Sequence, residues 1–388
     1  MNYILFDNFW RSNLLPLTYL RPVADIRIGI LTIREKWEKY LGEPTSTLTE
    51  PYLRRKYPIV EADDNIVING SVCPGPELLE EIKSLKTGEV LHHEDIIIAM
   101  RLQRMDLEKL DEESMEGEDM IESKTDPLKI TNTWDIFSRN DRAIREDFSL
   151  LTAGRKSAPI SKTNQVIGNQ VFIEPGSKVE CSVLNSHDGP IYIGKDAEVM
   201  EGSLIRGPFA LGEHAVVKMG AKIYGPTTIG PYSKVGGEVN NSVFFGYSNK
   251  AHDGFMGHSV IAEWCNLGAD TNISNLKNNY EQVKLWNYTD KTFVETGLQF
   301  CGLVMGDHSK CGINTMFNTG TVVGINANIF GSGYQRNFVP SFVWGGTSGY
   351  HTYLIDRAIA VARVVYRRRG LEFTGIDEQI LRDVYELL

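Results

Sequence analysis

The chain has 388 residues, of which 42% are hydrophobic and 23% are charged, a balance typical of globular proteins with a core of their own. This length predicts two domains or three. With 40 basic and 50 acidic residues the formal net charge is −10, which argues against a nucleic-acid partner because such partners are bound by basic faces.

Neither a membrane partner nor a secretion signal is expected from the apolar pattern. A membrane-spanning helix needs about 18 or more consecutive apolar residues, and the sequence has no such run. The first residues lack a basic start, and Asp7 and Asn8 interrupt their short apolar run. The five cysteines are scattered without a C-x-x-C pair, which predicts a reduced, cytoplasmic setting and no cysteine-based metal site.

Residues 1–105 alternate short apolar strands with amphipathic segments, which predicts an α/β domain. The segment 29–42 places Ile30, Ile33, Trp37 and Leu41 on one helical face. A second helix is expected over 75–85, with Pro76 in its first turn. The expected strands are residues 3–6, 65–70 and 94–102.

Residues 106–160 are predicted to connect this domain to the next. The stretch 106–123 carries nine acidic residues and one basic residue, which is typical of a solvated loop. Over 133–151, Trp134, Phe137 and Ile144 recur at roughly helical spacing, so we expect a linking helix there.

From residue 166 on, an apolar side chain recurs at every sixth position with a few breaks, within a domain predicted to span residues 161–346. The longest unbroken run is Ile193, Val199, Ile205, Leu211, Val217, Ile223, Ile229 and Val235. The same step runs through Ile167, Ile173 and Val179, through Phe255, Ile261, Leu267 and Ile273, and through Met305, Cys311, Phe317, Val323 and Ile329. A period of six is the hexapeptide signature of a parallel β-helix, in which the sixth residues point inward.

The repeat breaks in two places and then stops. Its register slips between Val235 and Phe255, and residues 276–304 are predicted to leave the rod as an insertion. Residues 347–388 read as two C-terminal helices that would cover the open end of the rod. The cluster Arg367–Arg369 is expected to interact with the carbonyl end of the first of these helices.

Two segments inside the repeat, "KAHDGFMG" and "NLGADTNISN", resemble the acetyltransferase half of the bifunctional GlmU-like family that makes UDP-N-acetylglucosamine. The resemblance implies a left-handed parallel β-helix, homotrimers with sites shared between subunits, and transfer of acetyl from acetyl-CoA to a sugar phosphate, glucosamine-1-phosphate first. The hand of the winding comes from the resemblance, since spacing alone does not determine it.

The same resemblance assigns roles to residues. His252 falls on the family's catalytic histidine, which takes the proton of the acceptor amine, and Glu238 falls on a glutamate of the same site. A histidine is suited to this because its ordinary pKa lies near neutral pH. The positions implied to bind sugar phosphate or acetyl-CoA are Asn266 and Asn275, Asn240 and Phe255 in place of a family lysine and tyrosine, and Lys218 or Lys222 in place of a phosphate-binding arginine.

The N-terminal segment "LLPLTYLRPVADIRIGILTI" is similar to one in sugar nucleotidyltransferases, with Arg21 where lysine often stands. Arg11 matches a phosphate-loop arginine, and Asn69 and Gly70 precede Ser71, which replaces a metal-binding aspartate. The glycine-rich loop that brings backbone N–H groups to phosphate is missing. Use of UTP and Mg²⁺ by this domain is therefore left open.

Two other functions stay open from the sequence. One is a zinc enzyme that hydrates carbon dioxide, because zinc catalysis needs three histidines plus water, and His214, His252, His258 and His308 could supply them. The other is a noncatalytic trimeric binding or assembly protein with a decayed transferase domain. His258 itself is interpreted as a surface residue.

Overall fold

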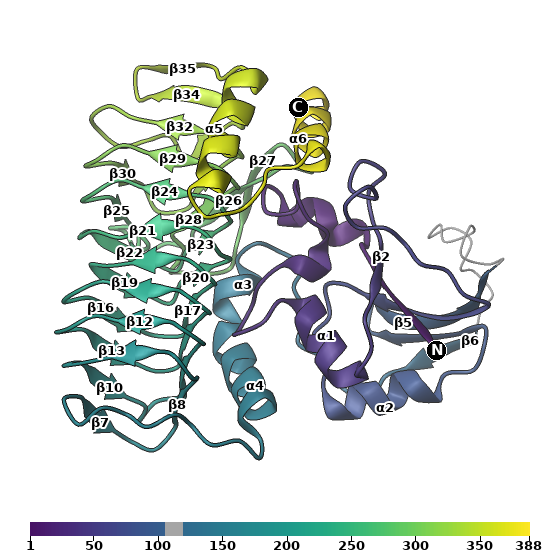
Figure 1. The fold of residues 1–388 in the computed structure, drawn as a ribbon. Helices are drawn as coiled ribbons and strands as arrows, with labels where there is room; N and C mark the ends of the chain where they lie inside the picture. The colour runs from purple at the N-terminus through teal and green to yellow at the C-terminus, as the bar shows by residue number, and fades with distance from the viewer. Residues whose placement is uncertain (105–118) are drawn as a thin grey trace. The chain divides into compact units, whose positions relative to one another are not determined.

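The computed structural model describes residues 1–104 and 119–388 (Figure 1). The chain forms two compact units. The N-terminal unit comprises Met1–Leu14, Leu20–Ile26 and Leu31–Thr131, and the β-helix unit comprises Leu15–Tyr19, Arg27–Ile30 and Asn132–Leu388. Among the described residues, no helix has the length and apolar character needed to cross a membrane.

The N-terminal unit is built on one mixed sheet, in agreement with the predicted α/β class. Its strand order is β2-β1-β3-β5-β4-β6, with β1 parallel to both β2 and β3, and β5 antiparallel to β3 and β4. The strands are β1 Asn2–Phe6, β2 Ser46–Leu48, β3 Asp64–Asn69, β4 Glu89–His93, β5 Ile96–Gln103 and β6 Asp119–Glu122. The helices are η1 Phe9–Leu14, η2 Val23–Asp25, α1 Ile33–Leu41 and α2 Pro76–Ser84.

Helix α1 begins four residues later than predicted because Thr32 caps it. The Thr32 hydroxyl accepts from the Glu35 amide, and the Glu35 carboxylate accepts from the Thr32 amide, so two amides of the first turn are satisfied. Trp37 then points into the core, where its Nε1 donates to the Val72 carbonyl at 2.8 Å.

The acidic loop predicted over residues 106–123 is wrong for the last part of that stretch. Residues 106–118 of the prediction lie outside the described residues. Residues 119–122 form β6, which pairs in parallel with β4. The sequence did not predict this strand, because all four of its side chains are exposed and show no alternation of apolar and polar residues. The strand is defined by its backbone pairing alone.

The predicted linking helix is a short α3 Asp135–Ser138 followed by α4 Asn140–Thr152, and both belong to the β-helix unit. Asn140 joins three segments of this unit. Its Oδ1 accepts from the Gly29 amide at 2.7 Å, and its Nδ2 donates to the Pro226 carbonyl at 3.0 Å.

Residues 165–352 wind through three sheets whose strands pair in parallel, apart from β35, which pairs antiparallel with β34, and this confirms the predicted fold class (Figure 1). The first sheet contains β7 Gln165–Ile167, β10 Val183–Asn185, β13 Leu204–Arg206, β16 Lys222–Tyr224, β19 Glu238–Asn240, β22 Phe255–Gly257, β25 Asn272–Ile273 and β30 Met316–Phe317. The second contains β8 Val171–Ile173, β11 Ile191–Ile193, β14 Phe209–Leu211, β17 Thr227–Ile229, β20 Val243–Phe244, β23 Val260–Ile261, β28 Leu303–Met305, β31 Thr321–Val323 and β33 Phe338–Val339. The third contains β9 Lys178–Val179, β12 Glu198–Val199, β15 Val216–Val217, β18 Lys234–Val235, β21 Asn249–Lys250, β24 Asn266–Leu267, β29 Lys310–Cys311, β32 Asn328–Ile329, β34 Val343–Gly346 and β35 Gly349–Thr352.

The eight residues of the long hexapeptide run all point into the coil, and none is more than 2% exposed. They belong to one core cluster that continues through Ile261 and Phe317 to Val339. Burying such an aliphatic side chain stabilises the fold by about 1.5–3 kcal/mol, so stacking of the coils supplies most of the driving force.

The predicted ladder is wrong at Ile167 and at Phe255. Ile167 is 40% exposed, and Val166 occupies the inward register opposite Leu184. Phe255 pairs with Glu238 on the outer face, while Met256 beside it is fully buried.

A shortened coil explains the second error. Val217 aligns with Val235, 18 residues on, whereas Val235 aligns with Lys250, only 15 residues on. The next coil is also short, because Val239 aligns with Met256 and Phe244 with Ile261, each 17 residues on, so the inward residue before Ile261 lies five residues back and not six.

The insertion contains an antiparallel hairpin, β26 Lys284–Asn287 and β27 Thr292–Glu295. The rod resumes at Leu303, where β28 pairs with β31. Trp286 of the hairpin stacks on Phe338 of the second sheet with ring centroids 4.3 Å apart, so the insertion packs against the coil.

The two C-terminal helices exist as predicted, α5 Ile355–Arg367 and α6 Gly375–Leu387, but they do not cover the end of the rod (Figure 1). Tyr366 of α5 stacks on Trp264, several coils from the end, with ring centroids 4.0 Å apart. Arg369 donates to the Asn249 side chain at 3.2 Å. Aromatic turn residues on the side of the coil therefore hold these helices there.

The register correction predicts unequal stability losses at two neighbouring residues. Met256→Ala should lower the free energy of unfolding by about 2–5 kcal/mol, because it leaves a cavity inside the coil. Phe255→Ala, the matched control on the outer face, should cost clearly less. Urea unfolding followed by circular dichroism measures both, and a larger loss for Phe255→Ala would contradict the register.

Candidate functional site

His252 lies on a tight turn of the coil between β21 and β22, where the chain passes from the third sheet to the first, and its side chain is exposed. The turn packs directly against Gly236 and Gly237 of the preceding coil. A Cβ atom at Gly237 would lie 2.9 Å from the Asp253 Cα and 3.0 Å from the His252 carbonyl oxygen. Glycine there lets the two turns approach closely, which fixes where the His252 backbone lies.

Glu238 begins β19, directly after Gly237, and its carboxylate is held by two neighbours. The Tyr224 hydroxyl donates to Oε1 at 2.7 Å, and Lys222 Nζ lies 3.3 Å from Oε2. The Tyr224 hydrogen bond, followed by the contact with Lys222, lowers the pKa of Glu238. Glu238 is therefore ionised at neutral pH.

The structure brings most of the predicted β-helix residues to one corner and the sheet beside it. Lys222, Glu238 and Phe255 are direct neighbours on β16, β19 and β22, and Asn240 lies two residues along β19. Lys218 belongs to the same stack of turns as His252. A Cβ atom at Gly236 would lie 3.0 Å from the Lys218 Cβ and 2.7 Å from the carbonyl oxygen of Ala251, the residue before His252.

The two predicted asparagines lie apart. Asn266 is on β24 of the third sheet, beside the same corner, and its side chain meets Asn249 at 3.5 Å. Asn275 follows β25 at the next corner of the coil, where its Nδ2 lies 2.9 Å from His258 Nδ1. Within this chain, Asn275 is therefore not part of the His252 corner.

The interpretation of His258 as a surface residue is wrong. Its ring meets Phe137 edge-on at 5.7 Å and stacks on Phe300 at 5.3 Å. With the Asn241 amide turned so that its nitrogen faces the carbonyls of Pro226 and Phe137, its oxygen accepts from His258 Nε2 at 3.1 Å. Burial lowers the pKa of His258 to about 4, so the ring is neutral, with a partner for each nitrogen.

The four histidines considered for zinc lie on three different corners of the coil. His214 and His308 are on turns from the second sheet to the third, His258 is on a turn from the first to the second, and His252 is on a turn from the third to the first. Among the described residues, one group has three potential ligand atoms within 4.8 Å, namely Asp196, Glu213 and His214. It is exposed and holds a single histidine, so one chain does not assemble the three-histidine site.

A polar hollow of about 560 Å³ lies beside the start of the insertion. Asn278, Asn318, Tyr334 and Asn337 contribute to its lining. The sequence analysis did not identify this hollow, because its walls come from three segments that are adjacent only in the folded coil.

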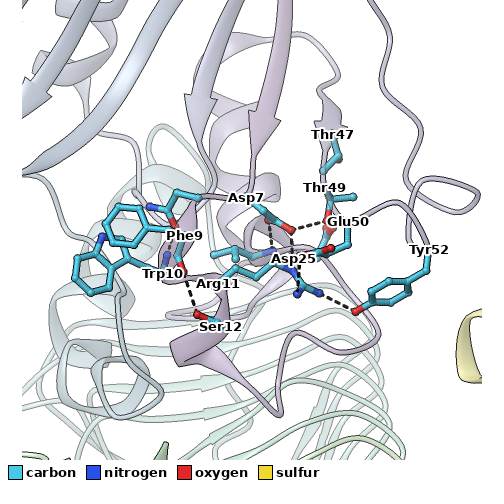
Figure 2. Close-up of polar contacts among 12 residues, drawn as sticks. Asp7, Phe9, Trp10, Arg11, Ser12, Asp25, Thr47, Thr49, Glu50 and Tyr52 are labelled. Carbon is cyan, nitrogen blue, oxygen red and sulfur yellow. Dashed lines mark hydrogen bonds and ion pairs between the residues drawn. The ribbon is translucent and has the colours of Figure 1, made fainter. Parts of the chain in front are cut away.

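In the N-terminal unit, polar side chains gather where the parallel strands end (Figure 2). Asp7 follows β1 and Thr49 follows β2. Asp7 is buried: its Oδ1 accepts from the Val23 amide at 2.7 Å, and its Oδ2 accepts from the Thr49 hydroxyl and from Arg11 Nε at 3.1 Å. Burial raises the pKa of Asp7 although Arg11 and Thr49 act in the opposite direction.

Arg11, predicted to bind nucleotide, is buried against this carboxylate. Its other nitrogens reach the Tyr52 hydroxyl at 2.9 Å and the Glu50 carboxylate at 3.5 Å (Figure 2). Sequence reasoning missed Asp7 as a site residue. Its position directly after an apolar strand was the available signal, since ligands of α/β sheets bind at the carboxyl ends of strands.

The other predicted nucleotide-binding residues are also inside the unit. Arg21 is buried, and Asn69 donates to the Ile97 carbonyl at 2.8 Å while accepting from the Ser71 hydroxyl at 2.7 Å. A Cβ at Gly70 would lie 3.1 Å from the Phe6 carbonyl oxygen, so glycine serves close packing of β3 on β1.

Comparison with known proteins agrees with both halves of the chain. Residues 3–156 match the family described as sugar nucleotidyl transferase. A bifunctional sugar-1-phosphate nucleotidylyltransferase/acetyltransferase from Sulfurisphaera tokodaii is 32% identical over 212 residues, which cover 54% of this chain and 52% of the relative. A bifunctional protein GlmU from Methanocaldococcus jannaschii is 33% identical over 136 residues, covering 35% of this chain and 28% of that protein.

These matches support a GlmU-like family. The chain spans about half the length of the first GlmU-like relative and less of the second. A solved structure of the polySia-specific acetyltransferase NeuO is 12% identical with a TM-score of 0.29, covering 52% of this chain and 98% of that one; a likeness this weak carries no argument.

The Tyr224 contact predicts how Glu238 titrates. Tyr224→Phe removes the main cause of the lowered pKa of Glu238, so the carboxyl should titrate at higher pH. Tyr232→Phe, on a turn that stacks on Tyr247, is the control and should leave Glu238 unchanged. Carbon NMR of the labelled carboxyl measures both, and an unchanged titration in Tyr224→Phe would contradict the assignment.

Proposed function

We propose that the β-helix unit is an acetyl-CoA-dependent N-acetyltransferase that acts on an amino-sugar phosphate, with glucosamine-1-phosphate as the first candidate acceptor. The observation that carries the proposal is the His252 corner. There an exposed imidazole stands on a turn that packs against Gly237, and the residue after Gly237 is Glu238, whose carboxylate Tyr224 and Lys222 hold ionised. The names of the GlmU-like relatives, which combine nucleotidyl and acetyl transfer, support the same reaction.

Each group at this corner has a task in acetyl transfer. The acceptor amine attacks the thioester carbonyl, its proton passes to His252, and coenzyme A leaves as the thiol. A positioned general base contributes about 10²–10⁴-fold to such a step, and holding the two reactants together contributes more. Glu238 is placed to orient the sugar or the imidazole, and Asn266 offers an amide for the acyl carrier.

The acceptor's phosphate needs a cation, and the corner has two lysines. Lys222 is already paired with Glu238, whereas Lys218 lies on the turn stack that leads to His252. Asn275 sits on another corner, so its part in this reaction requires a second copy of the chain. We therefore propose a homotrimer with shared sites, since closed symmetric assemblies can bring different corners of identical subunits together. We also propose a cytoplasmic location.

The acetylation assay tests this function. The protein is incubated with acetyl-CoA and glucosamine-1-phosphate, and release of free thiol is followed. His252→Ala should lower the rate at least 10²-fold because the general base is lost. His187→Ala, an exposed histidine on another corner, should retain activity.

Full activity in His252→Ala would remove the base assignment. Absence of thiol release from the wild-type protein with any amino-sugar phosphate would favour the noncatalytic binding protein instead.

A second candidate function is nucleotidyl transfer by the N-terminal unit, favoured by the family match over residues 3–156. Its residues do not fit a magnesium site. Ser71 is buried and bonded to Asn69, and the nearby carboxylate of Asp7 is already bonded to Arg11, Thr49 and the Val23 amide. Mg²⁺ prefers open carboxylate and phosphate oxygens, which these bonded groups do not offer.

The altered donor set predicts little nucleotidyl transfer. With UTP, Mg²⁺ and N-acetylglucosamine-1-phosphate, we expect pyrophosphate release at the level of a sample without the sugar phosphate. Ser71→Asp, which restores a carboxylate at the family's position, is the matched test of whether that residue alone limits the reaction. Rapid pyrophosphate release by the wild-type protein would contradict this reading of the unit.

A further inference from the structure

One side chain of the inward ladder is a lysine. In the third sheet Lys250 aligns with Val235 on one side, and its neighbour Asn249 aligns with Asn266 on the other, which places Lys250 beside Leu267. Lys250 is 1% exposed, in a column otherwise filled by valine, leucine, isoleucine and cysteine. A methionine or leucine would fill this place without a charge.

The Lys250 ammonium group reaches two turn carbonyls. Nζ donates to the Gly236 oxygen at 3.2 Å and to the His252 oxygen at 2.9 Å. These oxygens belong to successive coils, at the corner where His252 is exposed. Lys250 therefore joins the two turns from inside the coil, while the glycines at 236 and 237 let them approach from outside.

Burying an ammonium group without a paired carboxylate is unfavourable. Burial lowers the pKa of Lys250 to about 8, and the acidic groups that face it, Asp253, Asp270 and the Cys311 thiol, offset this only in part. The lowered pKa means that the charged form is disfavoured in the fold: the unfolding free energy rises with pH from about 8 to the ordinary lysine value. The coil thus carries a destabilising residue.

We propose that Lys250 is a positioning residue that clamps the His252 turn from within the coil, so that the imidazole is held at the reacting amine. The role rests on the proposed acetyl transfer. Lys250 touches backbone oxygens only, so its effect reaches the reaction through the position of His252.

The test compares Lys250→Met with a matched control, Lys310→Met. Lys310 is a partly buried lysine of the third sheet, next to the inward residue Cys311, and its Nζ donates to the His308 carbonyl at 2.7 Å, on a different corner. For Lys250→Met we expect at least a 10-fold fall in kcat with little change in KM, and at least 10-fold faster hydrogen exchange in the peptide 251–255. Lys310→Met should leave both readouts unchanged.

A second variant guards against a folding defect. Lys250→Gln keeps a donor for one carbonyl and should show an intermediate loss in both readouts. Slow exchange in 251–255 with unchanged kcat in Lys250→Met would overturn the proposal, as would failure of both Lys250 variants to fold, since the lysine would then serve the coil itself. If the wild-type protein transfers no acetyl group, the proposed function fails, and the exchange rates still decide whether Lys250 holds the turn.

Discussion

The β-helix unit depends on one constraint: no coil can bury its own inward side chains, so each coil needs its neighbours. The ladder from Ile193 to Val235 is buried because equivalent residues stack at nearly constant register. This stacking leaves the corners as the parts of the coil free to vary. A coil that is three residues shorter also changes which later residues in the sequence point inward, because every following coil aligns with the one before it.

The proposed chemistry lies where that regularity is broken. After the short coil, a lysine takes an inward place, glycines replace side chains at the neighbouring turn, and His252 stands exposed on the tight corner. The regular coils are stabilised by stacked aliphatic side chains, which have no chemically reactive groups. The shortened coil therefore loses part of its apolar packing. In return the backbone of the His252 corner is contacted by Lys250 inside the coil and by the turn at Gly236 and Gly237.

The N-terminal unit shows a different relation between fold and chemistry. Its sheet has the polar carboxyl edge at which α/β proteins bind ligands, yet the groups there are bonded to one another. Asp7, Arg11, Thr49 and Tyr52 form a hydrogen-bonded network (Figure 2). Ser71 is bonded to Asn69. In this unit the polar edge of the sheet thus serves internal stability.

The sequence by itself determined the coil, the α/β character of the first domain and the two terminal helices, because these follow from local periodicity that each stretch carries alone. The resemblance to the GlmU-like family grouped His252, Glu238, Phe255 and Lys218 or Lys222 in one site, and the register of the first sheet makes Lys222, Glu238 and Phe255 direct neighbours. Only the tertiary structure decided that Met256 and not Phe255 is inward, that Lys250 lies inside the coil, that Asn275 bonds to a partly buried His258, and that Arg11 is bonded to Tyr52. Each of these depends on the length of one coil or on contacts between distant segments, and neither leaves a period in the sequence.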